Sequence, residues 1–188
     1  ELLNNLPLGV FATSSIDALV HAVESSLSPK ATAYTKLFGY KAIEMILQAY
    51  RRIVAAGNTK ESRAAESETM LVASNFAGLA FGTAGCAAVH AMAYPLGAVY
   101  HVAHGESNYA LFTGVLKNYL EIKNSGEIQT MNEYLAKQLD CSVFVVYEEL
   151  EKLLNHILPK KPLLAYCVAA EYLTKLNDSG MKTQGRLL

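Results

Sequence analysis

The sequence predicts an all-α fold, a multi-helix bundle that forms a single domain over residues 1–188. Apolar residues recur at helical spacing along most of the chain, and segments that alternate apolar and polar residues, as half-buried strands do, are scarce. Glycine, asparagine and proline separate the apolar segments at intervals typical of helices. Because no repeat of fixed period is visible, we expect a globular bundle around one core.

The first half of the chain contains three predicted helices. The first runs from about Ser15 to Leu27, with N-cap candidates before it and Ser28-Pro29 as its stop. The second covers about Thr32 to Ala56 and ends at Gly57-Asn58, after a long apolar stripe at helical spacing. The third covers about Lys60 to Gly82. Each of the three ends at residue types that disfavour a helix.

The second half begins with a short predicted helix from Cys86 to Tyr94. We expect Pro95 to end it, because proline disfavours a helical conformation in the residue before it. An irregular stretch from Gly97 to His104 follows. Further helices are predicted at about residues 105–122, 126–139, 142–158 and 163–176, followed by a polar tail.

Composition excludes several classes of function. With 16 basic and 17 acidic residues the formal net charge is −1, so we expect no nucleic-acid partner. Cys86, Cys141 and Cys167 are odd in number and lie in apolar surroundings, which suits free thiols in a reduced compartment. The first residues show no export signal. We therefore expect a cytoplasmic protein without disulfides.

One apolar stretch, from Leu71 to Ala91, approaches the ~20 residues that a membrane-spanning helix requires. Ser74, Asn75 and Thr83 interrupt it, together with several glycines. The core helix of a soluble protein has the same composition. We therefore expect no membrane partner.

Asp17 and His21 are the first candidates for chemistry. Their spacing places both side chains on one helical face, with Cβ atoms roughly 6 Å apart, which suits two ligands of one metal ion. A structural alternative exists, because the preceding Ser14-Ser15 would allow Asp17 to complete a capping box in a first helical turn. The spacing alone leaves both interpretations open.

Three further histidines, His90, His101 and His104, lie near the end of a segment, Leu71 to Gly105, that contains no Asp, Glu, Lys or Arg. Burying an imidazole with an unsatisfied polar atom costs roughly 1–3 kcal/mol. A metal ion would remove this cost for two of them, since the intervening Pro-Leu-Gly can fold His90 and His104 toward a common point. One carboxylate and up to three imidazoles suit iron(II), zinc or manganese.

Two strings of sequence carry a family resemblance. SSIDALVHAVES at residues 14–25 and VHAMAYPLGAVYHVAHGESNYA at residues 89–110 occur in this order. Together they resemble the iron-containing (group III) alcohol dehydrogenases, whose pattern has D-A-L-x-H-A-x-E, then H-x-x-x-[H/Y]-P-L-G and H-G-x-x-N. The resemblance covers nearly all of this chain but only the C-terminal helical half of the family, which shares its architecture with dehydroquinate synthase. It implies a helical, metal-binding catalytic domain.

The resemblance also implies roles for individual residues. It makes Asp17, His21, His90 and His104 the metal ligands. It places His101 beside the nicotinamide and the substrate, where an imidazole is a candidate proton relay and catalytic residue. The metal is expected to act as a Lewis acid on the substrate oxygen, and not as a redox centre.

Tyr94 and Asn108 match positions of the substrate pocket. Many alcohol dehydrogenases of the family carry a histidine where this chain has Tyr94, and Tyr94 together with the string HGESNY is more similar to the 4-hydroxybutyrate dehydrogenase branch. Glu24 matches the glutamate of the first string. We expect it to be either an ion-pair partner, which we favour, or a support for a metal ligand.

Family enzymes begin with an α/β nucleotide-binding domain that is absent from this chain, in which no glycine-rich phosphate loop follows a strand. The resemblance therefore implies a missing N-terminal domain as partner, NAD or NADP bound mainly there, a small alcohol or aldehyde substrate, and a homodimer. The expected reaction is the reversible conversion of 4-hydroxybutyrate to succinate semialdehyde, and the chain alone is expected to be inactive. The alternatives are another primary-alcohol dehydrogenase of the family and a metal-free helical interaction module.

Overall fold

The computed structural model describes Leu3 and residues 5–166, and every regular element within them is helical, which confirms the all-α prediction. The α-helices are α1 (Leu8–Leu27), α2 (Ala33–Ala55), α3 (Lys60–Ala65), α4 (Ser67–Ala84), α5 (Ala88–Tyr100), α6 (His104–Ile122), α7 (Glu127–Leu139) and α8 (Val146–Ile157). Two short 3-10 helices, η1 (Val143–Val145) and η2 (Leu163–Tyr166), complete the elements of the described part.

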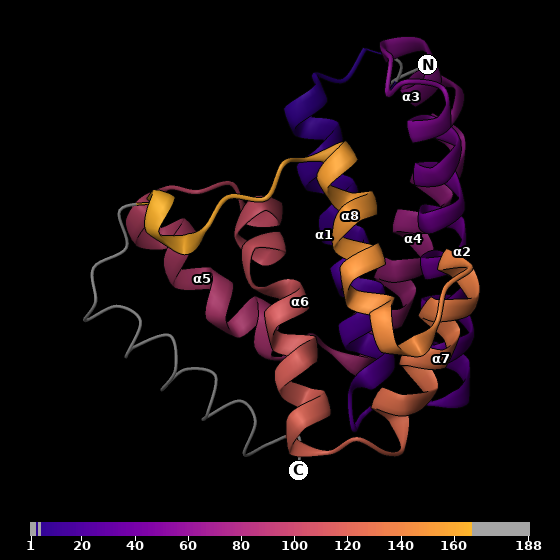
Figure 1. Cartoon of the computed structure of the whole chain (residues 1–188), viewed down its shortest axis with the longest axis vertical. Coiled ribbons are helices and arrows are strands. Elements are labelled where there is room, and N and C mark those ends of the chain that lie inside the picture. The colour runs from indigo at the N-terminus through magenta and orange to yellow at the C-terminus, as the bar shows by residue number, and fades with distance from the viewer. Residues whose placement is uncertain (1–2, 4, 167–188) are drawn as a thin grey trace.

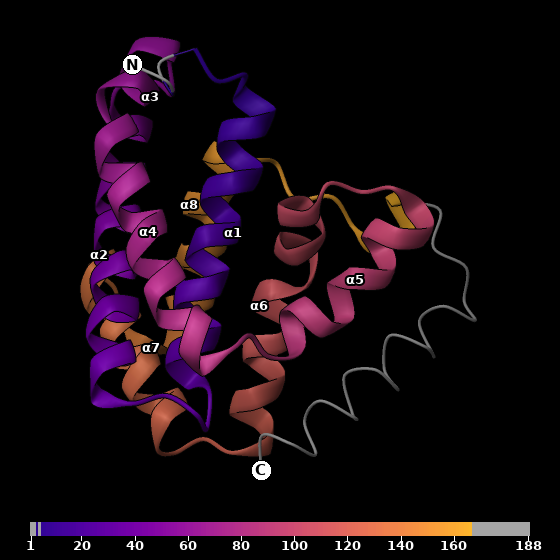
Figure 2. The same cartoon turned by 180° about the vertical axis from the view of Figure 1, so that it is seen from behind.

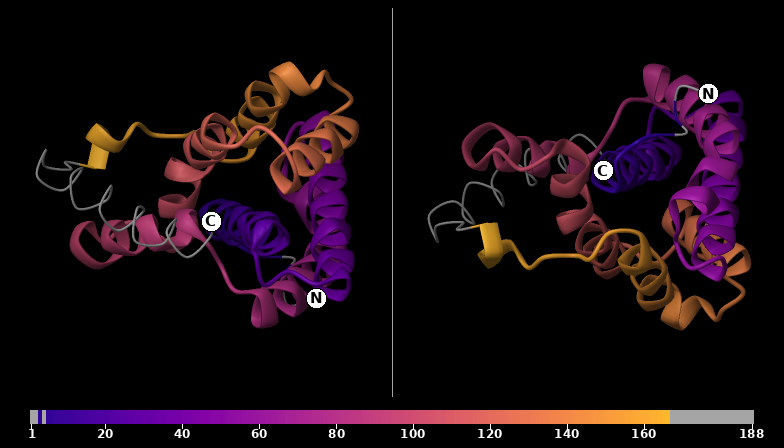
Figure 3. Two further views of the ribbon diagram at one scale, coloured as in Figure 1. Left: turned by 90° about the horizontal axis from the view of Figure 1, so that it is seen from below. Right: turned by 90° about the horizontal axis from the view of Figure 1, so that it is seen from above.

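Helix α1 is the central element of the bundle. It packs against α2 and α4 on one side and against α6 on another, with a smaller contact to α7. Figure 1 shows α8, which packs against α2 and α7, passing in front of α1, and Figure 2 shows α5 extending away from α4 and α1. The end-on views of Figure 3 show α1 enclosed by the other helices. Side chains on α1 can therefore meet partners from several elements.

The apolar stripe of α1 forms the middle of the core. Ile16, Leu19, Val20 and Val23 follow helical spacing and are fully buried. They belong to one cluster with the apolar face of α2, which includes Ile43, Ile46, Leu47 and Tyr50. The Tyr50 hydroxyl donates a 2.7 Å hydrogen bond to Ser15 Oγ. This bond fixes the register of α1 against α2.

Two glycines allow neighbouring helices to approach α1 closely. A Cβ atom added at Gly39 of α2 would overlap the side chain of Ser26, and one added at Gly105 of α6 would overlap the backbone carbonyl of Thr13. The contact at Gly105 brings the beginning of α6 against α1. It thereby places His104, the first residue of α6, beside the middle of α1.

Helix α1 begins earlier than predicted, at Leu8 instead of about Ser15. The residues expected to cap it lie inside the helix, where the hydroxyls of Thr13, Ser14 and Ser15 donate to carbonyls one turn back. The residue at the N-cap position is Pro7, and the first turn contains no acidic residue. Asp17 therefore lies in the middle of α1, and the capping-box alternative is wrong.

The third predicted helix is divided in two. Glu66 interrupts it with backbone angles φ −95° and ψ 4°, so that α3 ends at Ala65 and α4 begins at Ser67. Both carboxylate oxygens of Glu66 accept hydrogen bonds of 2.7 Å from the Arg52 guanidinium, which stabilises this corner against α2. The long-range pair explains why apolar spacing alone did not reveal the break.

The prediction that Pro95 ends the helix is wrong, because α5 continues through Pro95 to Tyr100. Proline removes one backbone donor, and the remaining turns of this short helix tolerate that loss. The actual stop is His101, whose left-handed conformation (φ 54°) lets its N–H bond to the carbonyl of Leu96. The predicted irregular stretch at 97–104 therefore shrinks to a sharp corner between α5 and α6.

The remaining boundaries differ less. The helices predicted at 32–56, 105–122 and 126–139 agree with α2, α6 and α7, and the one predicted at 142–158 begins with η1 before α8. The last predicted helix, 163–176, is described only as η2 up to Tyr166, and the rest of it lies outside the described residues. Within the described residues no single helix is long and apolar enough to cross a bilayer. Helices α4 and α5 reach the required length and hydropathy only when taken together, and the chain bends by 104° between them.

Candidate metal centre

Three of the four predicted metal ligands converge on one point. Asp17 comes from the middle of α1, His90 from the first turn of α5, and His104 from the start of α6. Their donor atoms lie within 4.8 Å of one another. Nε2 of His90 is 3.5 Å and Nε2 of His104 is 3.6 Å from Oδ1 of Asp17. One carboxylate and two imidazoles thus meet although they are far apart in the sequence.

His21, the fourth predicted ligand, lies beside this group rather than within it. Its Nδ1 is 3.7 Å from Oδ2 of Asp17. Its ring is stacked between Phe81 and His90, with centroid distances of 4.2 and 4.4 Å and interplanar angles of 13° and 17°. Its donor atom converges instead with those of Cys86 and His90. The structure therefore brings His21 to the site but into a second cluster of donors.

The side-chain amide of Asn108 lies among the three converging residues, and its hydrogen-bonding groups are not all satisfied there. Its side chain is fully buried, and its Nδ2 lies 2.6 Å from Asp17 Oδ1, 3.1 Å from His90 Nε2 and 3.3 Å from His104 Nε2. An amide NH₂ group has only two protons to offer these three neighbouring atoms. The Oδ1 atom of Asn108 is also buried without a hydrogen-bond partner. A carboxylate and imidazoles around an unsatisfied centre fit a divalent first-row metal ion.

Glu24 orients His90 from behind. The carboxylate is fully buried; Oε2 is 2.6 Å from Nδ1 of His90, and Oε1 accepts a 2.7 Å hydrogen bond from the backbone N–H of Val89. With the Nδ1 proton directed to Glu24, Nε2 of His90 faces Asp17. Glu24 is thus an ion-pair partner of His90 and also fixes its orientation; of the two roles expected from the sequence, the ion pair was the favoured one.

The pKa values of these groups follow from burial and pairing. Burial disfavours the charged form of His90, but hydrogen bonds to Asp17, Cys86 and Glu24 outweigh burial and raise the pKa of His90 to about 11. Burial raises the pKa of Asp17, yet the hydrogen bonds to His90 and Asn108 bring it below its ordinary value. Burial lowers the pKa of His21. In the metal-free chain at neutral pH, His90 therefore carries a proton that a metal ion would replace.

The two remaining predicted site residues lie at the edge of the cluster. The Tyr94 side chain is exposed, and its ring is 5.8 Å from the His104 ring at an interplanar angle of 24°. His101 is exposed at the corner between α5 and α6. Their roles toward cofactor and substrate, and that of Asn108 toward substrate, stay predictions.

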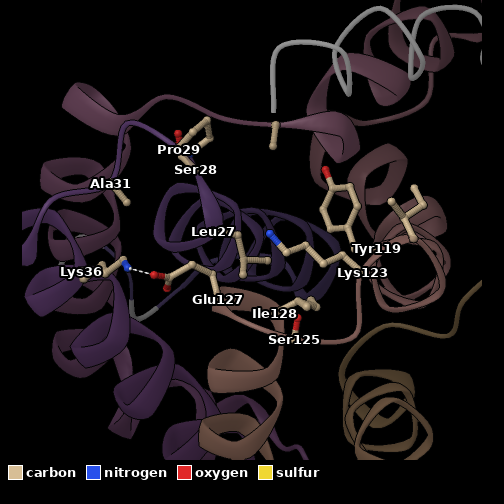
Figure 4. Close-up of a pocket in the computed structure, with 12 residues that line it drawn as sticks. Leu27, Ser28, Pro29, Ala31, Lys36, Tyr119, Lys123, Ser125, Glu127 and Ile128 are labelled. Atoms are coloured by element: carbon tan, nitrogen blue, oxygen red, sulfur yellow. Dashed lines mark ion pairs between the residues drawn. The ribbon is translucent and has the colours of Figure 1, made fainter. Parts of the chain in front are cut away.

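A cavity of about 330 Å³ lies elsewhere, between the end of α1, the start of α2 and the junction of α6 with α7. Figure 4 shows Leu27, Tyr119 and Lys123 around it, with Lys36 and Glu127 joined at 2.6 Å across one side. The residues that line it include none of the metal-cluster residues.

Residues 11–187 match the model of the Fe-containing alcohol dehydrogenase family, C-terminal. The chain belongs to this family. The resemblance read from the two strings is therefore confirmed.

Among curated proteins, the chain is 44% identical over all 188 residues to the 4-hydroxybutyrate dehydrogenase of Clostridium kluyveri, and it spans 50% of that relative. It is 43% identical over 116 residues, 62% of this chain and 28% of the relative, to long-chain-alcohol dehydrogenase 1 of Geobacillus thermodenitrificans.

Solved structures of the family have the same fold. A 1,3-propanediol oxidoreductase superposes with a TM-score of 0.75 at 27% identity, over 95% of this chain and 47% of that one. An archaeal alcohol dehydrogenase from a Red Sea brine pool superposes with a TM-score of 0.80 at 22% identity, over 97% and 47%. This chain therefore spans about half the length of these relatives, and the family model that it matches is the C-terminal one.

Proposed function

We propose that this chain is the metal-binding half of an NAD(P)-dependent alcohol dehydrogenase whose substrate is 4-hydroxybutyrate, oxidised reversibly to succinate semialdehyde. The observation that carries the proposal is the convergence of Asp17, His90 and His104 from three helices. The identity of 44% to a 4-hydroxybutyrate dehydrogenase supports the choice of substrate. In this proposal the nucleotide binds mainly to the half of the enzyme that this chain lacks, in a cytoplasmic homodimer.

The proposed metal ion, iron(II) by the family's description, is held by Asp17, His90 and His104. His21, which already contacts Asp17, supplies a fourth donor. When bound, the metal supplies Lewis acidity to the oxygen atom of the substrate. Glu24 keeps Nε2 of the buried His90 directed toward the ion, while His104 forms the exposed side of the cluster.

His101 and Tyr94 at the edge of the cluster, and Asn108 within it, are assigned to substrate binding and proton transfer. His101 lies three residues before the proposed ligand His104 and is exposed, so its imidazole can pass a proton between the site and solvent. Tyr94 lies against His104 and limits the space for the substrate chain. Asn108 donates to Asp17 and fixes the carboxylate at one wall of the substrate site.

A second candidate function is the oxidation of another primary alcohol. The 43% identity to a long-chain-alcohol dehydrogenase over 116 residues favours it. The two candidates differ in the substrate, because 4-hydroxybutyrate carries a carboxylate that a simple alcohol lacks.

The test is a spectrophotometric assay of NAD(P)⁺ reduction by the enzyme that contains this chain together with its nucleotide-binding half. 4-Hydroxybutyrate should be oxidised with a kcat/KM at least about tenfold above that for 1-butanol, which corresponds to about 1.4 kcal/mol of discrimination. The His101→Phe variant should lose turnover most strongly below neutral pH. Equal kcat/KM for both alcohols would favour the second candidate, and a lack of activity with either would reject the dehydrogenase proposal.

A further inference from the structure

The cavity between the end of α1, the start of α2 and the junction of α6 with α7 has the size of a small ligand site. Its volume of about 330 Å³ lies at the lower end of the roughly 300–1,000 Å³ that is typical of ligand pockets. Several lining residues, among them Lys123 and Ser125, are exposed, so the cavity is open to solvent on one side. A compact ligand can therefore enter it without a change in the backbone.

One wall of the cavity is apolar. Half of the described residues that line it are aliphatic: Leu27, Pro29, Ala31, Ala87, Ile122 and Ile128. They come from the end of α1, from the links before α2 and α5, and from the junction of α6 with α7. Contact with this wall removes apolar surface of a ligand from water, which favours an aliphatic chain.

The charged groups of the cavity leave one positive charge uncompensated. Lys36 and Glu127 form an ion pair of 2.6 Å on one side. Figure 4 shows the Lys123 ammonium directed into the cavity toward Leu27, and no described residue forms an ion pair or a hydrogen bond with it. Two lysines and one glutamate thus give the lining a net charge of +1. One negative charge on a ligand would match it, whereas a second would be repelled by Glu127.

The Tyr119 hydroxyl is a second donor at the same wall. It lies four residues before Lys123, so both side chains are on one face of α6 and its C-terminal end. Its oxygen accepts a 3.3 Å hydrogen bond from the backbone N–H of Ala88, and none of the described residues accepts its proton. Burial, together with the nearby Glu24, raises the pKa of Tyr119, so the hydroxyl stays protonated at neutral pH. The two donors suit the two oxygens of one carboxylate.

We infer that this cavity is an accessory binding site for a small aliphatic monocarboxylate. The carboxylate accepts hydrogen bonds from Lys123 and Tyr119, and the aliphatic chain lies against the apolar wall. The site shares no residue with the Asp17–His90–His104 cluster and does not depend on alcohol oxidation.

The test is a titration of the ¹⁵N-labelled 188-residue chain with hexanoate, followed by two-dimensional nuclear magnetic resonance. The amide signals of Ala31 and Ser125, which line the cavity, should shift and saturate. 1-Hexanol lacks the charge, and adipate carries a second carboxylate at the end that meets the apolar wall. Both should therefore bind at least about fivefold more weakly than hexanoate, as expected for about 1 kcal/mol of a partly solvated ion pair.

Substitutions at the cavity should change the affinity for hexanoate in opposite directions. Lys123→Ala should weaken binding about fivefold. Its matched control is Lys60→Ala, an exposed lysine of α3 at the opposite end of the bundle (Figure 1), which should bind like the parent chain. Glu127→Gln should tighten binding, because it removes a negative charge and frees Lys36. Ala31→Leu should fill the cavity and abolish the saturable shifts.

The helical circular dichroism of each variant shows whether it is folded. Three results would overturn the site: no saturable shifts in the parent chain, equal weakening by Lys60→Ala and Lys123→Ala, or unchanged binding in Ala31→Leu. The Asp17→Ala/His104→Ala variant should bind hexanoate like the parent chain, and loss of binding in that folded variant would also overturn it. Failure of the proposed dehydrogenase centre has a different signature, because it would abolish alcohol oxidation and leave hexanoate binding intact.

Discussion

Glu24 acts on the proposed metal only through His90. Its fully buried carboxylate accepts the Nδ1 proton of His90 and two backbone N–H groups at the beginning of α5. The sequence showed only that a glutamate follows His21 by three positions. It did not show that α5 would begin directly over that glutamate, because this contact joins residues more than sixty positions apart.

Glu24→Gln should weaken binding of the proposed metal about 10–100-fold, since a neutral amide supports the required orientation and basicity of His90 less well. The affinity is measured by competition with a chromophoric chelator. Glu151→Gln is the matched control, because Glu151 pairs with Lys160 and Thr113, not with the metal cluster, and it should bind metal like the parent chain. An unchanged affinity in Glu24→Gln would show that Glu24 is only an ion-pair partner.

The proton on His90 gives metal binding a defined pH dependence. The pKa of His90 in the metal-free chain is about 11, above its ordinary value of 6.5, so binding at neutral pH displaces one proton from it. Apparent affinity should therefore rise about tenfold per pH unit between pH 7 and 9. Calorimetry in two buffers of different ionisation enthalpy counts the released protons, and a count of zero would contradict the predicted state of His90.

The raised pKa of His90 also determines whether the stability of the metal-free chain rises or falls with pH. A group whose pKa is higher in the folded than in the unfolded chain stabilises the fold fully below the unfolded value of 6.5, and this contribution is lost as the pH rises toward about 11. From His90 alone, the metal-free chain should be more stable at pH 6 than at pH 9. Thermal unfolding of the His90→Gln variant should show a weaker dependence over this range.

At the scale of elements, the position of α6 against α1 decides whether His104 reaches Asp17. Gly105 allows this contact, because a Cβ atom there would overlap the carbonyl of Thr13. The beginning of α6 would have to move away from α1 to make room. The spacing between the two donors therefore depends on a residue that carries no side chain.

Gly105→Ala should destabilise the chain by about 1–3 kcal/mol through overpacking and should weaken metal binding as His104 shifts. Gly114→Ala on the same helix is the control, because nothing lies within 4 Å of a Cβ atom there. It should leave metal binding unchanged and raise stability by about 0.5–1 kcal/mol, as alanine does in an exposed helix interior. Equal effects of the two substitutions, measured by thermal unfolding, would contradict the role given to Gly105.

Helix boundaries could be predicted from the sequence where residues next to the boundary determine it. Gly57-Asn58 and the residues around Gly126 stop helices through local conformation, and the boundaries of α2 and α7 followed from the sequence. The break at Glu66 relies on an ion pair with Arg52, and α5 tolerates Pro95 because its stop is the left-handed His101. These ends depend on contacts or conformations that apolar spacing does not contain.

At the scale of the whole molecule, the candidate site is assembled from three helices, the central α1 together with α5 and α6. The family resemblance named all four expected ligands from two short strings, and the structure brings Asp17, His90 and His104 together. The position of His21 could not be predicted in the same way, because it follows from the stack with Phe81. The burial of Asn108 among the ligands likewise requires the packing of α6 against α1.

The central claim is that Asp17, His90 and His104 hold a metal ion, and its most direct test is the metal content of the purified chain. Elemental analysis after loading with iron(II) under anaerobic conditions should find about one equivalent in the parent chain, as one donor set predicts. The control Glu151→Ala/His156→Ala, which removes a carboxylate and an imidazole from α8, should retain it. The Asp17→Ala/His104→Ala variant should contain no iron; equal iron in that folded variant and in the parent chain would contradict the account.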